Sequence, residues 1–425
     1  MKKLKLLGFG VALLLTGIAP LRGQTSREEI LATIEKSGGF YYAYPDKDIP
    51  PQTPPPAGYA PFYISHYGRH GSRYLTRASN YAKLLELFNR ADSKKLLTPL
   101  GASVHERVRK VCANADGREG SLSRLGEQQH RGIAERMMRS YPEVFATEGG
   151  APTITARSTI VPRCILSMAA FCERMKELNP QLHILRDANN LYMKYLNPSE
   201  DSIAGLSADI KKKRRHFADK LRYDRLLCSL FTDTSTVSDL MPPAQFLGDM
   251  FYLTSDMQDT ESDISFYDIF EPEELFQLWQ SRNYYWYLTL GPSPQHGSVA
   301  RRDAIPQLKN IVASANSVIA AKGRGADLRF GHDTNVMPLA ALLHLRNCFT
   351  PVADADSVLK VWSDFKVVPM GGNIQLVFYR KNGSDDVLVK FLHLERETLV
   401  PPVQSDMLPY YHWRDVEKFY ATLIN

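Results

Sequence analysis

Short strand-like runs and longer periodic segments alternate along the chain. The runs at 61–65, 153–156 and 327–330 span four or five residues and are flanked by Pro or Gly, which is typical of buried strands. Each run is followed by a short loop and then by a segment in which apolar residues recur every three or four positions. This repeated order of strand, loop and helix predicts an α/β fold with a mainly parallel central sheet.

Further elements extend this pattern on both sides. Helical periodicity extends over 80–90, 102–112, 124–141, 162–177 and 301–321, and it resumes after Asp333. Two more strands are predicted at 374–380 and 387–394. They are joined by Asn382-Gly383, a dipeptide that favours a tight hairpin turn.

The middle of the chain has a different character. Residues 179–297 are rich in helical patterns and charged side chains, and they show no convincing strand pattern. We therefore predict an α-helical cap inserted into a discontinuous, three-layer α/β domain formed by 24–178 and 298–425. Before the first strand, 41–59 contains six prolines, which exclude a helix or a central strand and predict an extended surface arm.

The first 23 residues have the pattern of a secretory signal peptide. Basic residues at Lys2, Lys3 and Lys5 precede an apolar run that ends in a turn at Pro20. The alternative is an uncleaved anchor, which the short length of the run disfavours. We therefore expect a periplasmic or secreted protein without stable membrane insertion after signal cleavage.

Charge and cysteine content narrow the choice of function. The formal net charge is +6, but residues 1–23 hold four basic and no acidic residues, so the remainder is nearly balanced. This removes the electrostatic argument for a nucleic-acid partner.

Five cysteines leave at least one thiol unpaired, and Cys172 shares a helical stripe with apolar residues. We predict no disulfide framework.

Candidate chemistry begins directly after the first predicted strand. The loop there places Arg69, His70, Gly71 and Arg73 at the expected carboxyl edge of the sheet, where open α/β sheets bind ligands. The arginines offer planar forks that match phosphate oxygens, and Gly71 lets the backbone approach a ligand closely. A neutral imidazole in such a loop can attack phosphorus while the arginines neutralise charge on the transferred group.

Two other predicted strands end in complementary groups. Arg157 follows the second strand, and His332 and Asp333 follow the third. Asp333 is placed to protonate a leaving alkoxide, although it could also simply cap the next helix. The i, i+4 spacing of His66 and His70 also fits a metal pair, but the glycines between and after them oppose a helix there. We expect neither a metal nor a cofactor.

These motifs resemble those of the histidine acid phosphatases, the second branch of the histidine phosphatase superfamily. The likeness rests on Arg69-His70-Gly71-Ser72-Arg73 and Gly331-His332-Asp333-Thr334-Asn335. Between them, Arg157-Ser158-Thr159 followed by Arg163 and Ser167 is similar to the family's third arginine segment, and 122–136 is similar to its Leu-Thr-x-x-Gly-x-x-Gln helix. The family includes phytases, glucose-1-phosphatase and multiple inositol-polyphosphate phosphatases.

The resemblance implies a role for each matching residue. It implies that His70 is the nucleophile that forms a phosphohistidine and that Asp333 is the proton donor. It implies a phosphate pocket made of Arg69, Arg73, Arg157 and His332, with Thr76 and Arg77 as further substrate contacts. At the proton-donor motif the chain carries His-Asp-Thr, as bacterial phytases and glucose-1-phosphatase do, where many inositol-polyphosphate phosphatases carry His-Ala-Glu.

The sequence therefore predicts an exported phosphomonoesterase that acts on a small phosphate ester, with phytate or another inositol polyphosphate favoured. Arg77 and the basic run at 211–215 could engage additional phosphates, although such a run is commonly a solvated helix face. The alternatives are a glucose-1-phosphatase-like or broad-specificity acid phosphatase, a phosphomutase, and an inactive anion-binding protein on the same fold. Export disfavours a mutase, and the presence of both His70 and Asp333 disfavours an inactive protein.

Overall fold

The computed structural model describes residues 25–47, 49–198 and 207–424. The predicted signal segment 1–23 lies outside the described residues. Within the described part, no helix combines the length and the apolar character that crossing a bilayer would require.

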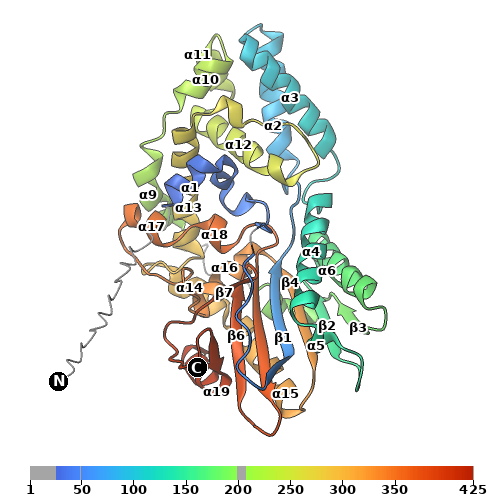
Figure 1. Cartoon of the computed structure of the whole chain (residues 1–425). Coiled ribbons are helices and arrows are strands. Elements are labelled where there is room, and N and C mark those ends of the chain that lie inside the picture. The colour runs from blue at the N-terminus through green and yellow to red at the C-terminus, as the bar shows by residue number, and fades with distance from the viewer. Residues whose placement is uncertain (1–24, 48, 199–206, 425) are drawn as a thin grey trace, which may run out of the picture.

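One sheet forms the centre of the lower half of the molecule (Figure 1). Its main path runs β3-β2-β4-β1-β5-β6-β7, and β8 pairs with β6. The strands are β1 (Tyr59–Arg69), β2 (Thr153–Ser158), β3 (Ile184–Asp187), β4 (Gly325–Gly331), β5 (Asn373–Lys381), β6 (Val387–His393), β7 (Arg396–Thr398) and β8 (Tyr410–His412). All five predicted strands are present, and β1 extends beyond its predicted run at both ends.

The sheet has a parallel core and an antiparallel side. β3, β2, β4 and β1 are parallel neighbours, whereas β5, β6, β7 and β8 join in antiparallel pairs. β5 and β6 form the predicted hairpin, and Gly383 supplies the positive φ of 76° that its turn requires. Nine consecutive residues of β1 are buried, because helices cover this strand on both faces.

Alternate side chains of the sheet enter two separate cores. Ile64, Leu328 and Val377 pack beneath α4 (Arg124–Ser140), α5 (Pro142–Phe145) and α6 (Pro162–Leu178). On the other face, Tyr63 and Phe378 join the core beneath α15 (Ile305–Ala320), α16 (Asp333–Leu342) and α19 (Trp413–Ile424). This period-two alternation generates three layers. The predicted three-layer α/β fold with a helical domain is confirmed.

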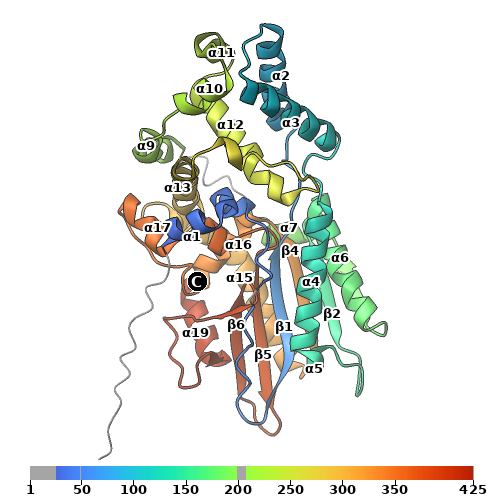
Figure 2. The same cartoon turned by 45° about the horizontal axis from the view of Figure 1, so that its top comes forward.

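Helices above the sheet form the second half of the molecule (Figures 1 and 2). They are α2 (Ser79–Ser93), α3 (Pro99–Ala115), α9 (Ser207–Ala218), α10 (Asp224–Leu230), α11 (Thr234–Leu240), α12 (Pro243–Asp256) and α13 (Pro272–Thr289). Although α2 and α3 precede the predicted insertion, they pack against α10, α11 and α12. The helical half thus draws on two separate stretches of sequence, while the predicted domain boundaries stay a prediction.

Smaller elements connect the two halves. They are α1 (Ser26–Ala32), η1 (Ile34–Tyr41), α7 (Asn190–Leu196), η2 (Met257–Asp259), η3 (Tyr267–Ile269), α14 (Gly297–Asp303), η4 (Ala355–Ser357), α17 (Val358–Val361) and α18 (Asp364–Val367). Of these, η1 lies against α12, α13 and α18. It therefore contacts helices from both the middle and the end of the chain.

Two sequence expectations were wrong. The stretch expected to hold only helices contains β3, an edge strand that pairs in parallel with β2. Its four side chains are mostly exposed, so it lacks the apolar pattern by which a strand is recognised. The single helix predicted at 301–321 is two helices, α14 and α15, and Pro306 lies in the first turn of the second.

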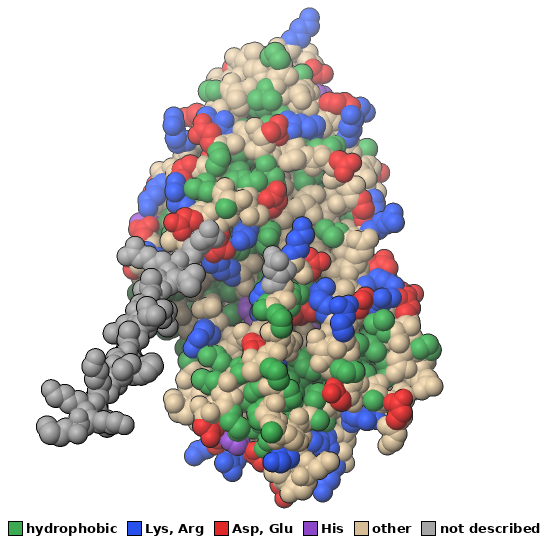
Figure 3. Space-filling view, in the orientation of Figure 1, with side chains coloured by type: hydrophobic (Ala, Val, Ile, Leu, Met, Phe, Trp, Pro, Cys, Tyr) green, Lys and Arg blue, Asp and Glu red, His purple; other side chains and the backbone are tan. Residues whose placement is uncertain are grey.

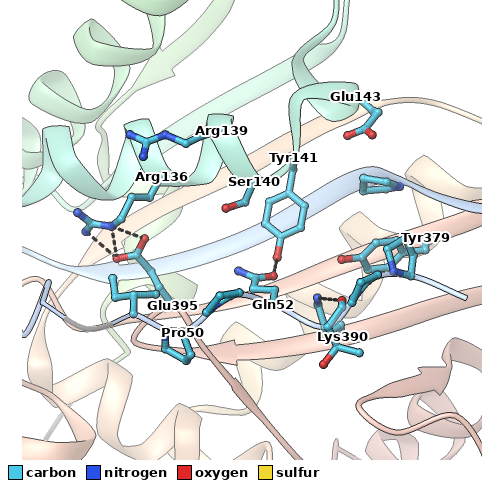
Figure 4. Close-up of a pocket in the computed structure, with 16 residues that line it drawn as sticks. Pro50, Gln52, Arg136, Arg139, Ser140, Tyr141, Glu143, Tyr379, Lys390 and Glu395 are labelled. Carbon is cyan, nitrogen blue, oxygen red and sulfur yellow. Dashed lines mark hydrogen bonds and ion pairs between the residues drawn. The ribbon is translucent and has the colours of Figure 1, made fainter.

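In the predicted arm, the described residues from Tyr42 to Gly58 form neither helix nor strand. The arm borders a cavity of about 620 Å³ together with α4, β5 and β6 (Figure 4). Some of the charged side chains that line it are paired, since Arg136 lies 2.7 Å from Glu395 and Lys390 lies 3.0 Å from Glu397. None of the predicted site residues lines it.

Neither the surface charge nor the cysteines indicate a functional site. On the face shown in Figure 3, Lys and Arg side chains are interspersed with Asp and Glu. All five cysteines are free thiols, and Cys164, Cys172 and Cys348 are buried. Burial raises the pKa of Cys164, which lies closest to the predicted site, to about 12, so this thiol stays protonated.

Candidate active site

The carboxyl ends of three parallel strands bring the predicted motifs together. The register pairs Arg69 with Gly331 and Ser158 with Phe330 across β1, β4 and β2. The His70 backbone N–H donates to the Gly331 carbonyl over 2.9 Å, which joins the two signature motifs directly. The rings of His70 and His332 consequently lie edge to face with centroids 5.8 Å apart.

Close backbone packing fixes the loop that carries His70. A Cβ on Gly71 would lie 2.4 Å from the Gly126 carbonyl oxygen, and a Cβ on Gly126 would lie 2.2 Å from the Ser72 carbonyl oxygen. Both positions therefore require glycine because α4 presses against the loop. In the same helix the Gln129 side chain accepts from the Ser72 backbone N–H (2.9 Å) and donates to the Ser72 hydroxyl (2.8 Å).

A single hydrogen bond determines which nitrogen of His70 is available. Nδ1 of His70 lies 2.8 Å from the Gly71 carbonyl oxygen. Because a carbonyl only accepts, Nδ1 carries the proton and Nε2 keeps its lone pair. The loop thus presents Nε2 as the atom able to act as a nucleophile.

His70 is held in the neutral form. Burial and the positive charges of Arg69, Arg163 and Arg73 lower its pKa well below the ordinary value of 6.5. The imidazole therefore stays uncharged at neutral and moderately acidic pH, as a nucleophile must. His66, four residues earlier, is a buried side chain against the rings of Phe171 and Phe330.

Arg69 is fully buried and anchored by backbone carbonyls. Its Nη1 donates to the carbonyls of Phe40 and, over 2.8 Å, Val368. Its Nη2 lies 3.2 Å from Oδ2 of Asp333. One arginine thus connects the nucleophile loop, the N-terminal η1 segment and the predicted proton donor.

Arg73 is held by contacts with η1, with its own loop and with α12. Its guanidinium lies over the Tyr41 ring at 4.8 Å, and its Nη2 donates to the Tyr41 hydroxyl over 3.3 Å. Its Nη1 donates to the Tyr74 carbonyl over 3.0 Å and lies 3.4 Å from Oδ1 of Asp256, at the end of α12. These contacts fix the orientation of the fork that the sequence predicted to bind phosphate.

Asp333 and His332 lie at the start of α16. Asp333 is its first residue, and its Oδ1 accepts from the Thr334 backbone N–H over 3.0 Å. Burial alone would raise its pKa, but Arg69, His332 and Arg73 lower it below 3.8 overall. Burial and Arg163 lower the pKa of His332 to about 4, and its Nε2 lies 3.3 Å from the Thr159 hydroxyl.

The two arginines of the third segment lie in different surroundings, and the predicted role of Arg157 in binding phosphate stays a prediction. Arg157, predicted to bind phosphate, lies over the Tyr192 ring at 4.7 Å and donates to the Tyr195 hydroxyl over 3.3 Å. Of the two, Arg163, in the first turn of α6, is the one whose charge lowers the pKa of both His70 and His332. The sequence contained Arg163 within the matched motif, but only the direction of helix α6 distinguishes the two.

Thr76 and Arg77 are exposed just beyond the nucleophile loop. A Cβ on Gly120 would be 3.7 Å from both the Thr76 Cα and the Arg163 Nη1, so this loop lies next to a pocket arginine. Thr76 therefore lies in the neighbourhood of Arg163, and Arg77 follows it in the chain. Their predicted role as substrate contacts stays a prediction.

Two buried carboxyls that sequence reasoning missed support the loop. Oδ1 of Asp259 accepts from the Ser72 hydroxyl over 2.5 Å, and Oδ2 of Asp256 accepts from the Leu75 backbone N–H over 3.0 Å. Burial raises the pKa of Asp256 to about 7, and burial together with Asp256 raises the pKa of Asp259 well above 3.8. Asp256 is the last residue of α12 and Asp259 the last residue of η2, so both carboxyls are far from the loop in sequence.

The pocket is short of hydrogen-bond acceptors. Within the described chain, the buried Nε atoms of Arg69, Arg73 and Arg163 have no acceptor. Unpaired buried donors are costly, so three of them around one imidazole indicate a site for an oxyanion that brings its own acceptors. Among the described residues, no group of three or more His, Cys, Asp or Glu side chains is arranged to hold a metal ion.

A family model for the histidine phosphatase superfamily (branch 2) matches residues 68–393, well over half of the chain. The chain belongs to this family. It is a phosphomonoester hydrolase of the histidine acid phosphatase type. The family match spans the nucleophile loop, the helical middle and the His332-Asp333 motif.

Solved structures share the fold of this histidine phosphatase at low sequence identity. The Bifidobacterium longum multiple inositol polyphosphate phosphatase, in complex with inositol hexasulfate, superposes with a TM-score of 0.75 at 18% identity, over 91% of this chain and 97% of that one. The D. castellii phytase gives 0.68 at 14%, over 98% and 90%. The apo Hafnia alvei phytase gives 0.54 at 12%, over 88% and 98%. No curated protein matches the sequence significantly.

Proposed function

We propose that this protein hydrolyses phytate or related inositol polyphosphates through a phosphohistidine at His70. The observation that carries the proposal is the convergence of three arginines with unpaired Nε donors on one neutral imidazole. A phosphate monoester dianion supplies both the charge and the acceptors that this pocket lacks.

In the first step, Nε2 of His70 attacks phosphorus and forms the P–N bond. The bond between phosphorus and the ester oxygen breaks, and protonated Asp333 gives its proton to the leaving alkoxide. Arg69, Arg73 and Arg163 donate to the three equatorial oxygens and stabilise their negative charge in the transition state. His332 faces the same group beside His70.

In the second step, water attacks the phosphorus of the phosphohistidine. The Asp333 carboxylate accepts a proton from this water, the P–N bond breaks, and the electron pair returns to Nε2. The Nδ1–H donated to the Gly71 carbonyl holds the ring in place through both steps. Inorganic phosphate leaves, and Asp333 is again protonated.

Two observations support an inositol polyphosphate as substrate. Structures that share the fold are an inositol polyphosphate phosphatase with inositol hexasulfate bound and several phytases. In this chain the exposed Arg77 follows the nucleophile loop, where a second phosphate of a multiply phosphorylated substrate could contact it. We further propose export to the periplasm or medium, which the basic and apolar pattern of residues 1–23 supports.

A phosphate-release assay tests the proposal. Phytate, glucose 1-phosphate and p-nitrophenyl phosphate are compared by kcat/KM, with His70→Ala as the negative control and His183→Ala, at an exposed histidine, as the matched control. We expect phytate to be the preferred substrate and only His70→Ala to abolish release. Preference for glucose 1-phosphate would indicate a glucose-1-phosphatase-like enzyme. Full activity of His70→Ala would exclude the covalent route.

A further inference from the structure

A second cavity lies in the helical half, away from the catalytic loop. It has a volume of about 320 Å³ and is bordered by α9, α12 and α13, which meet in the upper part of the molecule (Figure 2). Most of its lining is aliphatic or aromatic, and its charged side chains are Arg214 and Arg282. None of the described residues that line it carries a carboxylate. The cavity is thus apolar with two cationic groups.

Arg282 is buried, and one of its guanidinium nitrogens has no hydrogen-bond acceptor among the described residues. Its side chain is 8% exposed, and its guanidinium lies 4.3 Å from the rings of both Phe251 and Tyr252. Nη1 donates to the Gly38 carbonyl over 3.4 Å, whereas Nη2 is buried and has no acceptor among the described residues. Aromatic faces stabilise the charge of the guanidinium, but they leave its N–H donors unused.

Two further donors in the same lining are also unused. In the described chain, neither Nε of Arg214 nor Nε1 of Trp286 has an acceptor, although both atoms are buried. Arg214 lies over the Tyr285 ring at 5.1 Å, and burial lowers its pKa, with a smaller contribution from the charge of Arg282. Three donors and two like charges around one cavity match an anion with several acceptor oxygens.

The nearby carboxyl of Asp364 does not fill this role. It accepts from Nε1 of Trp279 over 2.9 Å and from the Phe40 backbone N–H over 3.1 Å. The charge of Arg282 acts on this carboxyl, but the described structure has no salt bridge between the two side chains. Burial also raises its pKa, which weakens it as a counter-charge. The side chains that line the cavity therefore provide no negative charge of their own to balance Arg214 and Arg282.

We propose that this cavity is a second anion-binding site, which takes a small organic anion with an apolar body, such as an aryl phosphonate, phosphate or carboxylate. Its oxygens accept from Arg214, Arg282 and Trp286, and its apolar body packs against the aromatic and aliphatic lining. The volume suits one small molecule. The site does not depend on the proposed substrate, because none of the proposed catalytic residues lines it.

The site also has a physical connection to the catalytic pocket. The Tyr41 ring is in contact range of two guanidinium groups, that of Arg73 at 4.8 Å and that of Arg282 at 5.8 Å. Tyr41 and Tyr252 additionally lie edge to face at 5.5 Å. A ligand that moves Arg282 or Tyr252 would therefore act directly on the ring that orients Arg73.

Calorimetric titration with phenylphosphonate tests the proposal, because its C–P bond is not a phosphate ester. We expect two binding sites for phenylphosphonate in the wild type and one in Arg214→Met. Arg215→Met is the matched control, because Arg215 is the exposed neighbour of Arg214, and it should keep two sites. We also expect inorganic phosphate to bind the second site at least about tenfold more weakly, since it lacks the apolar body. A single site in the wild type, or two in Arg214→Met, would overturn the proposal.

A crystal of the wild-type protein soaked in phenylphosphonate gives a readout that requires no variant. The expected result is ligand density in the cavity, with an oxygen within hydrogen-bond distance of Nη2 of Arg282. Density for water alone in the cavity would contradict a second anion site. Equal binding of inorganic phosphate and phenylphosphonate at this site would contradict the proposed ligand class.

Discussion

Nη2 of Arg69 lies 3.2 Å from Oδ2 of Asp333, so the residue before the nucleophile is ion-paired with the proposed proton donor. This contact has two opposite effects. It positions Asp333 at the pocket, and with His332 and Arg73 it lowers the pKa of a carboxyl that must be protonated to act. A bound phosphate dianion reverses this balance, because it competes for Arg69 and disfavours a second negative charge.

The pH dependence of the two kinetic constants should therefore differ. Activity falls as pH rises through the pKa of Asp333, and kcat/KM reports this pKa in the free enzyme whereas kcat reports it in the complex. We expect the fall in kcat at higher pH than the fall in kcat/KM. His70 stays neutral on the acid side because its pKa is lowered. We therefore expect an optimum of kcat on the order of pH 4–6. Coincident limbs, or an alkaline optimum, would contradict Asp333 as the acid.

Asp333→Asn should slow release of a poor leaving group far more than release of a good one. The amide cannot give a proton, so we expect a loss of about 10²- to 10⁴-fold in kcat/KM on phytate. p-Nitrophenolate needs little protonation, and the loss on p-nitrophenyl phosphate should be much smaller. Steady-state kinetics on both esters measures this difference. Equal losses would mean that Asp333 has an electrostatic role only.

Arg163→Lys should be more damaging than Arg157→Lys. Lysine is a point charge and cannot replace a planar fork beside His70 and His332, so we expect at least about a tenfold loss of kcat/KM for Arg163→Lys. Arg157 contacts Tyr192 and Tyr195, and its replacement should cost less than about threefold. If Arg157→Lys is the worse variant, the arginine that binds phosphate is the one the sequence resemblance indicated.

Arg77→Ala should distinguish a polyphosphate from a monophosphate. We expect KM for phytate to rise several-fold while KM for p-nitrophenyl phosphate stays unchanged, because only phytate carries a second phosphate. Arg90→Ala, at an exposed arginine of α2, is the matched control and should change neither constant. An equal rise for both substrates would place Arg77 at the reacting phosphate and remove this support for an inositol polyphosphate.

The buried carboxyls of Asp256 in α12 and Asp259 in η2 predict how stability changes with pH. The folded-state pKa values of Asp256 and Asp259 are raised, so their contribution to stability is complete below the ordinary carboxyl pKa of about 3.9 and is lost as pH rises through the folded value, about 7 for Asp256. We therefore expect Tm to fall as the pH rises from acid to neutral.

Thermal unfolding of Asp259→Asn checks this assignment. The variant removes one of the two coupled charges, so its Tm should depend less steeply on pH than that of the wild type. Asp385→Asn, at an exposed position in the β5–β6 turn, should retain the wild-type slope. An unchanged slope in Asp259→Asn would mean that other groups dominate the pH dependence.

Much of the fold follows from local sequence. The runs at 61–65, 153–156 and 327–330 predicted β1, β2 and β4 because strands buried on both faces are short and lack helical periodicity. Each is followed by a helix or loop whose start is marked by Pro or Gly. By contrast β3 was missed, because an exposed edge strand carries no apolar pattern.

The candidate site divides in the same way. Arg69, His70 and Arg73 are neighbours in one loop, so their proximity was readable from the sequence alone. The Nδ1 proton of His70 was not readable, since it depends on the local backbone bringing the Gly71 carbonyl within 2.8 Å. Nor were the different surroundings of Arg157 and Arg163, because they depend on how β2 and α6 pack in the folded chain.

Contacts between the two halves of the molecule could not be predicted from the sequence. Asp256 and Asp259 come from the end of α12 and from η2, more than 180 residues after the loop they support, and no local pattern links them to Ser72 or Arg73. Local sequence determines the conformation of each segment, because backbone sterics and burial patterns act over a few residues. Which charged groups meet, and thus which pKa values shift, is decided only when strand register and docking of the helical half bring distant segments into one desolvated site.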